Sequence, residues 1–129
     1  MEKMLDQTRQ ESWTVERQHT AAVVKSGGLE VLATPVLLTW MEQTAYELAQ
    51  EYMEDGDTTV GTQVGLKHLA ATPVGMEVRI TARVVEVEGR KITFHIEAED
   101  GKDAIATCEH QRFIVQEEKF MARCRSKNL

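Results

Sequence analysis

The sequence has few cysteines and no long apolar stretch, and both deficits exclude classes of protein. Its 129 residues include two cysteines, Cys108 and Cys124, which are too few for a disulfide framework and match no metal-ligand spacing. No stretch approaches the length of a membrane-spanning helix. The first residues, MEKMLDQTRQESW, contain no apolar core of signal-peptide length. These features predict reduced thiols and a cytoplasmic protein without a membrane partner.

Motifs for nucleic-acid, nucleotide and metal binding are also missing. The formal net charge of -6 repels a phosphate backbone, so nucleic acid is not an expected partner. There is no G-x-S-x-G nucleophile motif, phosphate loop or dinucleotide-binding fingerprint. No pair among the four histidines has metal-ligand spacing. The sequence therefore predicts neither a metal site nor a bound cofactor.

The length of the chain suits a single domain. We expect this domain to span residues 1–129, with 1–10 and 124–129 loose at its ends because these segments are polar or charged. Residues 1–10 and the tail from Glu117 are alternatively candidates for short helices. Hydrophobic residues make up 42% of the chain, which is enough for an ordinary buried core.

The clearest start of a helix is Thr34-Pro35, because threonine is favoured as an N-cap and proline at the first helical position. The next twenty residues, VLLTWMEQTAYELAQEYMED, contain no glycine or proline, and Gly56 supplies a C-terminal stop. Apolar residues cover much of the circumference of this helix, so we expect it to be largely buried.

Most of the remaining chain is predicted to form strands, because β-branched residues and period-two alternation recur between turn residues. A slip in the alternation at Val85 indicates a β-bulge or a strand buried on both faces. Gly89 and Asp100-Gly101 mark tight turns, which join antiparallel strands. The predicted strands are Trp13 to Val24, Thr58 to Leu69, Met76 to Glu88, Ile92 to Ala98, and Ala104 to Gln116.

One long helix with an antiparallel sheet is an α+β fold. Ser26-Gly27-Gly28 breaks the chain between the first strand and the helix, as a flexible connection found in loops and in lids over sites. A single sheet leaves open edges, which proteins usually cover or pair. A chain of this size with one such sheet often dimerises by joining edges, so a homodimer is expected.

Three residues are candidates for chemistry, each with a structural alternative. Thr34 caps the helix, or places its hydroxyl beside helix N–H groups that polarise a substrate carbonyl, or does both at once. Glu42 either lies on a narrow exposed stripe or is a carboxylate in an apolar site with a raised pKa. His68 is either a surface histidine or a general base.

Several segments in order resemble a known family. The runs GGLEVLATPVLLTWMEQTA, TTVGTQVGLKHLAATPVGMEV, VVEVEGRKITFHIEAED and HQRFIV are similar to the fluoroacetyl-CoA thioesterase-like branch of the hotdog superfamily. The resemblance spans roughly Trp13 to Arg123. It implies a hotdog fold, with one central helix wrapped by a five- to six-stranded antiparallel sheet, and side-by-side dimers that hydrolyse acyl-CoA thioesters without metal.

The resemblance also implies a set of site residues. The family's catalytic threonine, glutamate and histidine fall on Thr34, Glu42 and His68. Its glycine near the thioester falls on Gly61, and its active-site arginine falls on Arg112. The family's lid aromatics have no counterpart, because the matching place is KSGGLE. We therefore expect a small or short acyl-CoA as substrate, without selectivity for fluoroacetyl.

The spacing of the candidates constrains the mechanism. Thr34 and Glu42 lie about 12 Å apart along a helix that rises about 1.5 Å per residue. We therefore expect substrate, water or His68 between them, or a site assembled across a dimer. Glu42 either orients His68 as the base or attacks the thioester itself, with N–H groups near Val36 or Gly61 at the oxyanion.

Two further matters stay open on the sequence. The cations for the phosphates of CoA could include Lys67, Arg79, Arg90 and Arg112. A non-catalytic acyl-CoA-binding module or sensor is the alternative function, and a hotdog dehydratase is a weaker one because its His and Asp pattern is absent.

Overall fold

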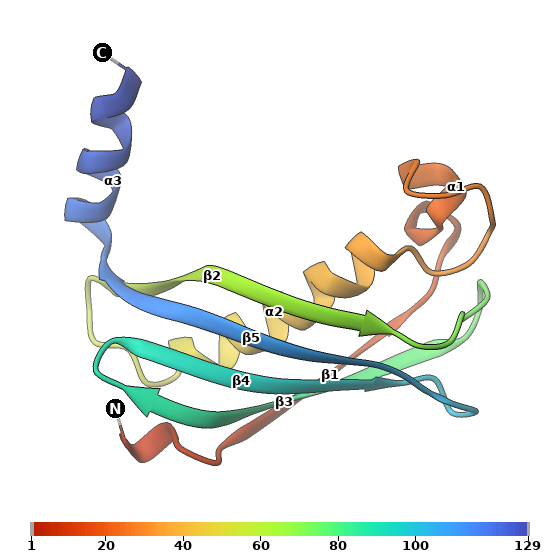
Figure 1. The fold of residues 1–129 in the computed structure, drawn as a ribbon, viewed down its shortest axis with the longest axis horizontal. Helices are drawn as coiled ribbons and strands as arrows, with labels where there is room; N and C mark the ends of the chain where they lie inside the picture. The colour runs from red at the N-terminus through yellow and green to blue at the C-terminus, as the bar shows by residue number, and fades with distance from the viewer. Residues whose placement is uncertain (1, 129) are drawn as a thin grey trace.

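One long helix lies against a curved sheet of five antiparallel strands (Figure 1). This computed structural model describes residues 2–128, so Met1 and Leu129 of the predicted loose ends lie outside it. The strands are β1 (Thr8–Thr14), β2 (Asp57–His68), β3 (Glu77–Glu88), β4 (Lys91–Glu99) and β5 (Ala104–Gln116). The α-helices are α1 (Ala21–Val24), α2 (Thr34–Gln50) and α3 (Glu117–Arg125), and the 3₁₀ turns are η1 (Glu2–Met4), η2 (Arg17–His19) and η3 (Ser126–Asn128).

The core forms between α2 and the sheet. Each strand turns alternate residues toward the helix, as the period of two requires, and Val78, Ile80, Ala82 and Val84 of β3 are all fully buried. The buried residues of α2 are Leu37, Trp40, Met41, Thr44, Ala45, Leu48 and Ala49. The expected buried helix and α+β fold are therefore confirmed.

The helix starts one residue earlier than predicted. Ala33 is the N-cap, since its extended backbone directs its carbonyl to the N–H of Leu37 at 3.0 Å. Thr34 is thus the first helical residue, and no side chain caps the helix. The prediction that Thr34 is the N-cap is wrong, and its hydroxyl is free for another partner.

The helix also ends earlier than predicted. Its last turn tightens, because Tyr52 and Met53 donate backbone hydrogen bonds to Ala49 and Gln50, three residues back. Gly56, expected to stop the helix, lies in the following turn with a φ of 88°.

The first predicted strand, Trp13 to Val24, is wrong over most of its length. Its β-branched residues favour a strand, but Thr20 accepts a hydrogen bond from the N–H of Val23 and thereby caps α1. Lys25 ends α1 in a left-handed conformation with a φ of 69°. The strand of this region is β1, whose polar sequence TRQESWT pairs with β3. Tertiary pairing here overrides local propensity.

The ends of the chain are more ordered in structure than expected. Residues 8–10 belong to β1, and Met4 of the short turn before it is fully buried. The tail forms α3, the helical alternative, which extends through Arg125. The order of strands is β1-β3-β4-β5-β2, with the predicted bulge between Val84 and Glu86 and a further one between Gly61 and Gln63.

Among residues 2–128, no helix has the length and apolar character needed to cross a membrane.

Candidate active site

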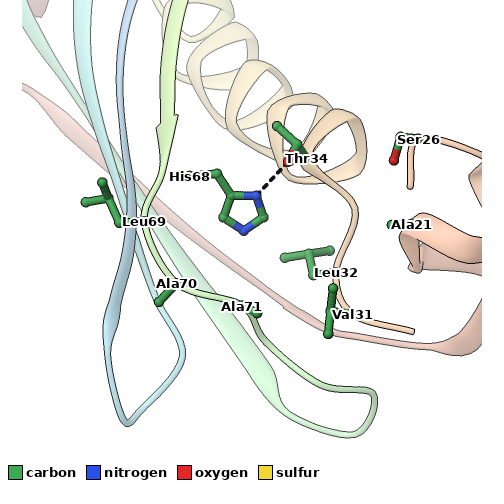
Figure 2. Close-up of a pocket in the computed structure, with 9 residues that line it drawn as sticks. All are labelled: Ala21, Ser26, Val31, Leu32, Thr34, His68, Leu69, Ala70 and Ala71. Atoms are coloured by element: carbon green, nitrogen blue, oxygen red, sulfur yellow. Dashed lines mark hydrogen bonds between the residues drawn. The ribbon is translucent and has the colours of Figure 1, made fainter. Parts of the chain in front are cut away.

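Thr34 and His68 meet where α2 begins and β2 ends. The hydroxyl of Thr34 lies 2.8 Å from Nδ1 of His68, within hydrogen-bond distance (Figure 2). Because Ala33 begins the helix, this hydroxyl lies beside the first N–H groups of α2 without being used for capping. The structure therefore joins two of the three predicted catalytic residues.

A pocket of about 310 Å³ opens beside this pair. Figure 2 shows that its walls come from the start of α2, the end of β2, and the segments around α1. It is lined by Ala21, Ser26, Val31, Leu32, Thr34, His68, Leu69, Ala70 and Ala71. No Phe, Tyr or Trp side chain occurs in this lining, which agrees with the absence of these residues from KSGGLE.

The environment of His68 favours the neutral imidazole. Burial lowers the pKa of His68 below its ordinary value of 6.5, and the nearby Ala70 backbone acts in the opposite direction. Its Nε2 is buried, and no partner with hydrogen-bond geometry occurs for it within residues 2–128. Unsatisfied buried polar atoms are rare in folded proteins, so this ring fits a chemical role better than a packing role.

The chain beyond His68 is held by the neighbouring hairpin. The N–H of Leu69 donates to the carbonyl of Ile105 at 2.7 Å. The buried hydroxyl of Thr72 donates to the carboxylate of Asp100 at 2.8 Å. These bonds fix one wall of the pocket to the start of β5 and to the turn before it.

Glu42 lies in a second cluster, beside the bulge of β2. Its Oε2 accepts a hydrogen bond from Nη1 of Arg112 at 3.1 Å. The side chain of Glu42 is 41% exposed, whereas that of Arg112 is 7% exposed. Glu42 thus lies between the exposed stripe and the apolar site that the sequence left open, because one oxygen is paired and the carboxylate remains half accessible.

Arg112 is fixed from several sides. Its Nε and Nη2 donate to the hydroxyl and the carbonyl of Thr59 at 2.8 and 3.1 Å. The guanidinium also stacks over the ring of Tyr46 at 5.6 Å. These contacts direct Nη1 at Glu42, so the arginine positions this carboxylate; direct contact with substrate remains a prediction.

His110 is a further member of the cluster that sequence reasoning missed. Its Nδ1 lies 2.7 Å from the carbonyl of Gln63, which can only accept, so Nδ1 carries the proton. Nε2 then accepts from Nη1 of Arg112 at 3.1 Å. Burial lowers the pKa of His110, and the charge of Arg112 lowers it further. The period-two spacing from Arg112 on β5 was the one available signal.

Gly61 makes room for this cluster. A Cβ atom at Gly61 would overlap Oε2 of Glu42, and would lie 3.2 Å from both Nη1 of Arg112 and Cε1 of His110. The predicted role of Gly61 near the reacting group thus has a physical counterpart, since only glycine lets β2 approach Glu42 so closely.

The two clusters remain separate within one chain. No hydrogen bond joins Glu42 to Thr34 or His68 among the described residues. The part of the chain that the structure describes also contains no group of three or more His, Cys, Asp or Glu side chains placed to hold a metal ion.

Comparison with known proteins decides the family. Residues 15–118 match the family model described as fluoroacetyl-CoA-specific thioesterase. The fluoroacetyl-CoA thioesterase of Streptantibioticus cattleyicolor is 38% identical over 98 residues, which cover 76% of this chain and 70% of that protein. The chain belongs to this thioesterase family. It is a thioester hydrolase with a hotdog fold, and the expected family is confirmed.

Solved structures of thioesterases have the same architecture. A fluoroacetyl-CoA thioesterase structure superposes with a TM-score of 0.90 at 30% identity, covering 95% of this chain and 96% of that one. A thioesterase superfamily member from Thermus thermophilus superposes with a TM-score of 0.90 at 25% identity, covering 96% and 92%. The site of this family member therefore lies on a hotdog scaffold of five strands.

Gly61→Ala should reduce thioester hydrolysis strongly while leaving the fold intact. The new methyl group must displace the flexible end of Glu42, which can swing into solvent. We expect kcat to fall by about tenfold or more, as for other misplaced catalytic groups, with a small change in Tm. Both are measured on the purified variant by a thiol-release assay and thermal unfolding.

Gly65→Ala is the matched control on the same strand. A Cβ atom there meets its nearest neighbour, the carbonyl oxygen of Glu109, at an ordinary 3.7 Å. This variant should keep wild-type kcat once light scattering shows that its mass in solution equals that of the wild type, because Gly65 lies on the exposed edge of β2. Equal activity of the two variants would show that the approach of Gly61 to Glu42 has no catalytic importance.

Proposed function

We propose that this protein hydrolyses the thioester of a small or short-chain acyl-CoA, using Thr34, Glu42 and His68 without metal or cofactor. The observation that carries the proposal is the Thr34–His68 pair at the N-terminus of α2, beside a pocket of about 310 Å³. A pocket of that size is at the lower end of the range for small-molecule sites, which favours a short acyl group.

The start of α2 suits the developing charge of the reaction. The hydrogen bonds of α2 begin with the N–H of Leu37, so the N–H of Val36 has no partner inside the helix, and Pro35 has no N–H. A thioester carbonyl beside Thr34 can accept a hydrogen bond from the N–H of Val36 as it becomes an oxyanion. The substrate class for which the family and its curated relative are named, a CoA thioester, supports the same assignment.

A homodimer joined through β2 would supply the contact between Glu42 and the Thr34–His68 pair that is missing within one chain. The outer edge of β2 carries no charged residue between Asp57 and Lys67, and residues 61–65 are all exposed. The opposite edge strand, β1, is protected by Arg9, which pairs with Glu11 and Glu51. Charged edges resist pairing and uncharged ones invite it, so β2 is the edge that we assign to the dimer.

Apolar exposure on β2 supports this assignment. Leu66 packs against the core, and Val64, two residues earlier, faces the same side of the strand. Val64 is nevertheless 44% exposed. A second subunit placed against this edge would cover it.

Two-fold symmetry then brings the two clusters together. Identical edge strands paired about a two-fold axis run antiparallel, so the Gly61 half of one β2 lies near the His68 half of the other. Glu42, which contacts the Gly61 half, would approach Thr34 and His68 of the partner subunit. This arrangement accounts for the separation of the clusters within one chain.

The mechanism then has two routes. In the first, Glu42 orients His68, and the neutral imidazole takes a proton either from water or from Thr34. If water attacks the carbonyl carbon, CoA thiolate leaves, takes the proton from the imidazolium, and the free acid is formed directly. If Thr34 attacks, CoA leaves in the same way, and water activated by His68 then hydrolyses the resulting threonine ester. In the second, Glu42 attacks the carbonyl carbon and expels CoA thiolate to form an anhydride, which water then cleaves to the free acid and the regenerated carboxylate. Trapping of labelled solvent oxygen in the carboxylate of Glu42 distinguishes the second route. By either route, we expect the enzyme to act in the cytoplasm.

Steady-state hydrolysis of a panel of acyl-CoAs tests the function. We expect the highest kcat/KM for short acyl groups. Because the pocket lining contains no Phe, Tyr or Trp, we also expect values for acetyl-CoA and fluoroacetyl-CoA within about tenfold of each other. Glu42→Gln should abolish turnover by either route. Binding of the panel without turnover would instead support the acyl-CoA sensor, and full activity of Glu42→Gln would exclude both routes.

The pH profile should report the neutral His68. Because burial lowers its pKa below 6.5, the base stays unprotonated down to that pH, and kcat/KM should fall only below pH 6.5. His68→Ala should lower kcat/KM by about 10² to 10⁴ and remove this limb, whereas Thr34→Ser should retain it. An acid limb above pH 6.5, or one that persists in His68→Ala, would contradict the assignment.

Val64→Lys should dissociate the dimer and inactivate the enzyme. The substitution places two like charges near the two-fold axis on an edge that is otherwise uncharged. The mass in solution is measured by light scattering, alongside activity. Val74→Lys, at a site 46% exposed in the turn before β3, is the control and should remain dimeric. A dimeric Val64→Lys protein would refute the β2 interface.

A further inference from the structure

A group of cations surrounds an exposed aromatic ring where α3 leaves the sheet. Arg90, Lys119 and Arg123 line a pocket of about 630 Å³ together with Phe120, which is 40% exposed. Arg90 is anchored there, because its Nε donates to the carbonyl of Ile114 at 3.0 Å. The remaining lining residues are Asp57, Val115 and Gln116.

These three cations differ from half of the eight arginines of the protein. Arg9, Arg79, Arg83 and Arg112 each form an ion pair with a carboxylate. In residues 2–128, none of Arg90, Lys119 and Arg123 lies within 4.0 Å of one. Three unpaired cations against the single carboxylate of Asp57, in a chain of net charge -6, make a local site for an anion.

The exposure of α3 also favours contact with a partner. The helix has nine residues and buries none of them. Isolated helices of this length are marginal in water. A ligand or a second subunit that packs against α3 would stabilise it.

Within one chain, this pocket is remote from the Thr34–His68 pair. The two sites lie at opposite ends of β2, because the N–H of Glu117 bonds the carbonyl of Gly56, just before the strand, and His68 ends it. Twelve residues of strand span about 36 Å at about 3.3 Å per residue. Figure 1 shows α3 rising past the free edge of β2, on the side where a partner would join.

In the β2-joined dimer, the distance becomes short. Antiparallel pairing of β2 places the Asp57 end of one subunit at the His68 end of the other. Thus α3 of each subunit lies at the end of the joined sheet where the other subunit holds its Thr34–His68 pair.

We propose that the pocket beside α3 binds the adenosine 3′,5′-bisphosphate part of an acyl-CoA whose thioester is held by Thr34 and His68 of the partner subunit. The proposal rests on the acyl-CoA substrate and the β2 dimer proposed above. The ring of Phe120 offers a face on which adenine stacks. The guanidinium groups and the ammonium group bind the phosphates by charge-assisted hydrogen bonds. Each active site is then completed by the helix of the other subunit.

Direct binding of adenosine 3′,5′-bisphosphate tests the pocket without reference to hydrolysis. Calorimetry on the intact protein should detect binding, and Lys119→Ala/Arg123→Ala should weaken it by about tenfold or more. Phe120→Leu should weaken it as well. Lys102→Ala, which removes a cation from the exposed turn between β4 and β5, is the control and should bind as the wild type does. Absence of binding, or equal binding by the double variant, would overturn the proposal.

Kinetics with a truncated substrate separate this pocket from the catalytic function. The acyl group of highest turnover is presented on CoA and on pantetheine, which lacks the nucleotide. Lys119→Ala/Arg123→Ala should raise KM for the acyl-CoA by about tenfold and leave kcat/KM for the acyl-pantetheine unchanged. Wild-type KM for the acyl-CoA would refute the nucleotide site while leaving the hydrolase function intact. A loss on both substrates would show that α3 has only a structural role.

Mixed dimers test the contribution of the partner. A dimer of one Thr34→Ala subunit and one Lys119→Ala/Arg123→Ala subunit should retain one intact site with wild-type KM. A dimer that carries all three substitutions in one subunit and none in the other should have no intact site. The reverse result would place both halves of the site in the same subunit and contradict the proposal.

Discussion

The close approach of α2 to the edge strand β2 is the contact on which the candidate site depends. At one end of this contact, the hydroxyl of Thr34 meets Nδ1 of His68. At the other end, Glu42 fits against Gly61, where a methyl group would collide with the carboxylate. The core packing of α2 sets its distance from the sheet, so the same apolar contacts that stabilise the fold also place the polar groups.

The charges at the two ends of this contact are controlled in different ways. His68 is kept neutral chiefly by burial, which lowers its pKa. His110 is also kept neutral by burial and by the charge of Arg112, which lower its pKa. Its Nε2 accepts a hydrogen bond from the same guanidinium nitrogen that donates to Glu42. Because the folded pKa of His110 lies below 6.5, it contributes stability above that pH, and the contribution is lost as the unfolded chain takes up protons below it.

The free edge of β2 connects the fold with the proposed function. An uncharged edge strand is a liability in a monomer, and here it borders both candidate clusters. A symmetric partner would cover it, bring Glu42 to the other subunit's histidine and carry α3 to the entrance of the site. One interface would thus protect the edge, complete the catalytic set and add a binding surface for the nucleotide.

The sequence by itself determined the elements whose signals are local. The long apolar helix, the late strands, the bulge after Val84 and the turns at Gly89 and Asp100 follow from period, glycine and proline, and they are present in the structure. Thr34, Glu42 and His68 were singled out by resemblance to the family, whose membership is confirmed, while their catalytic roles stay predictions.

Only the tertiary structure decided which residues meet. The polar segment TRQESWT forms a strand because it pairs with β3. The last β-branched residues of the predicted strand belong instead to α1, which the side chain of Thr20 caps. Ala33 displaced Thr34 as the N-cap, which left the hydroxyl to His68. His110 gained its role from Arg112 and Gln63, which lie across a sheet ladder and leave no mark in its own neighbourhood of the sequence. Such contacts depend on long-range packing, which no local pattern encodes.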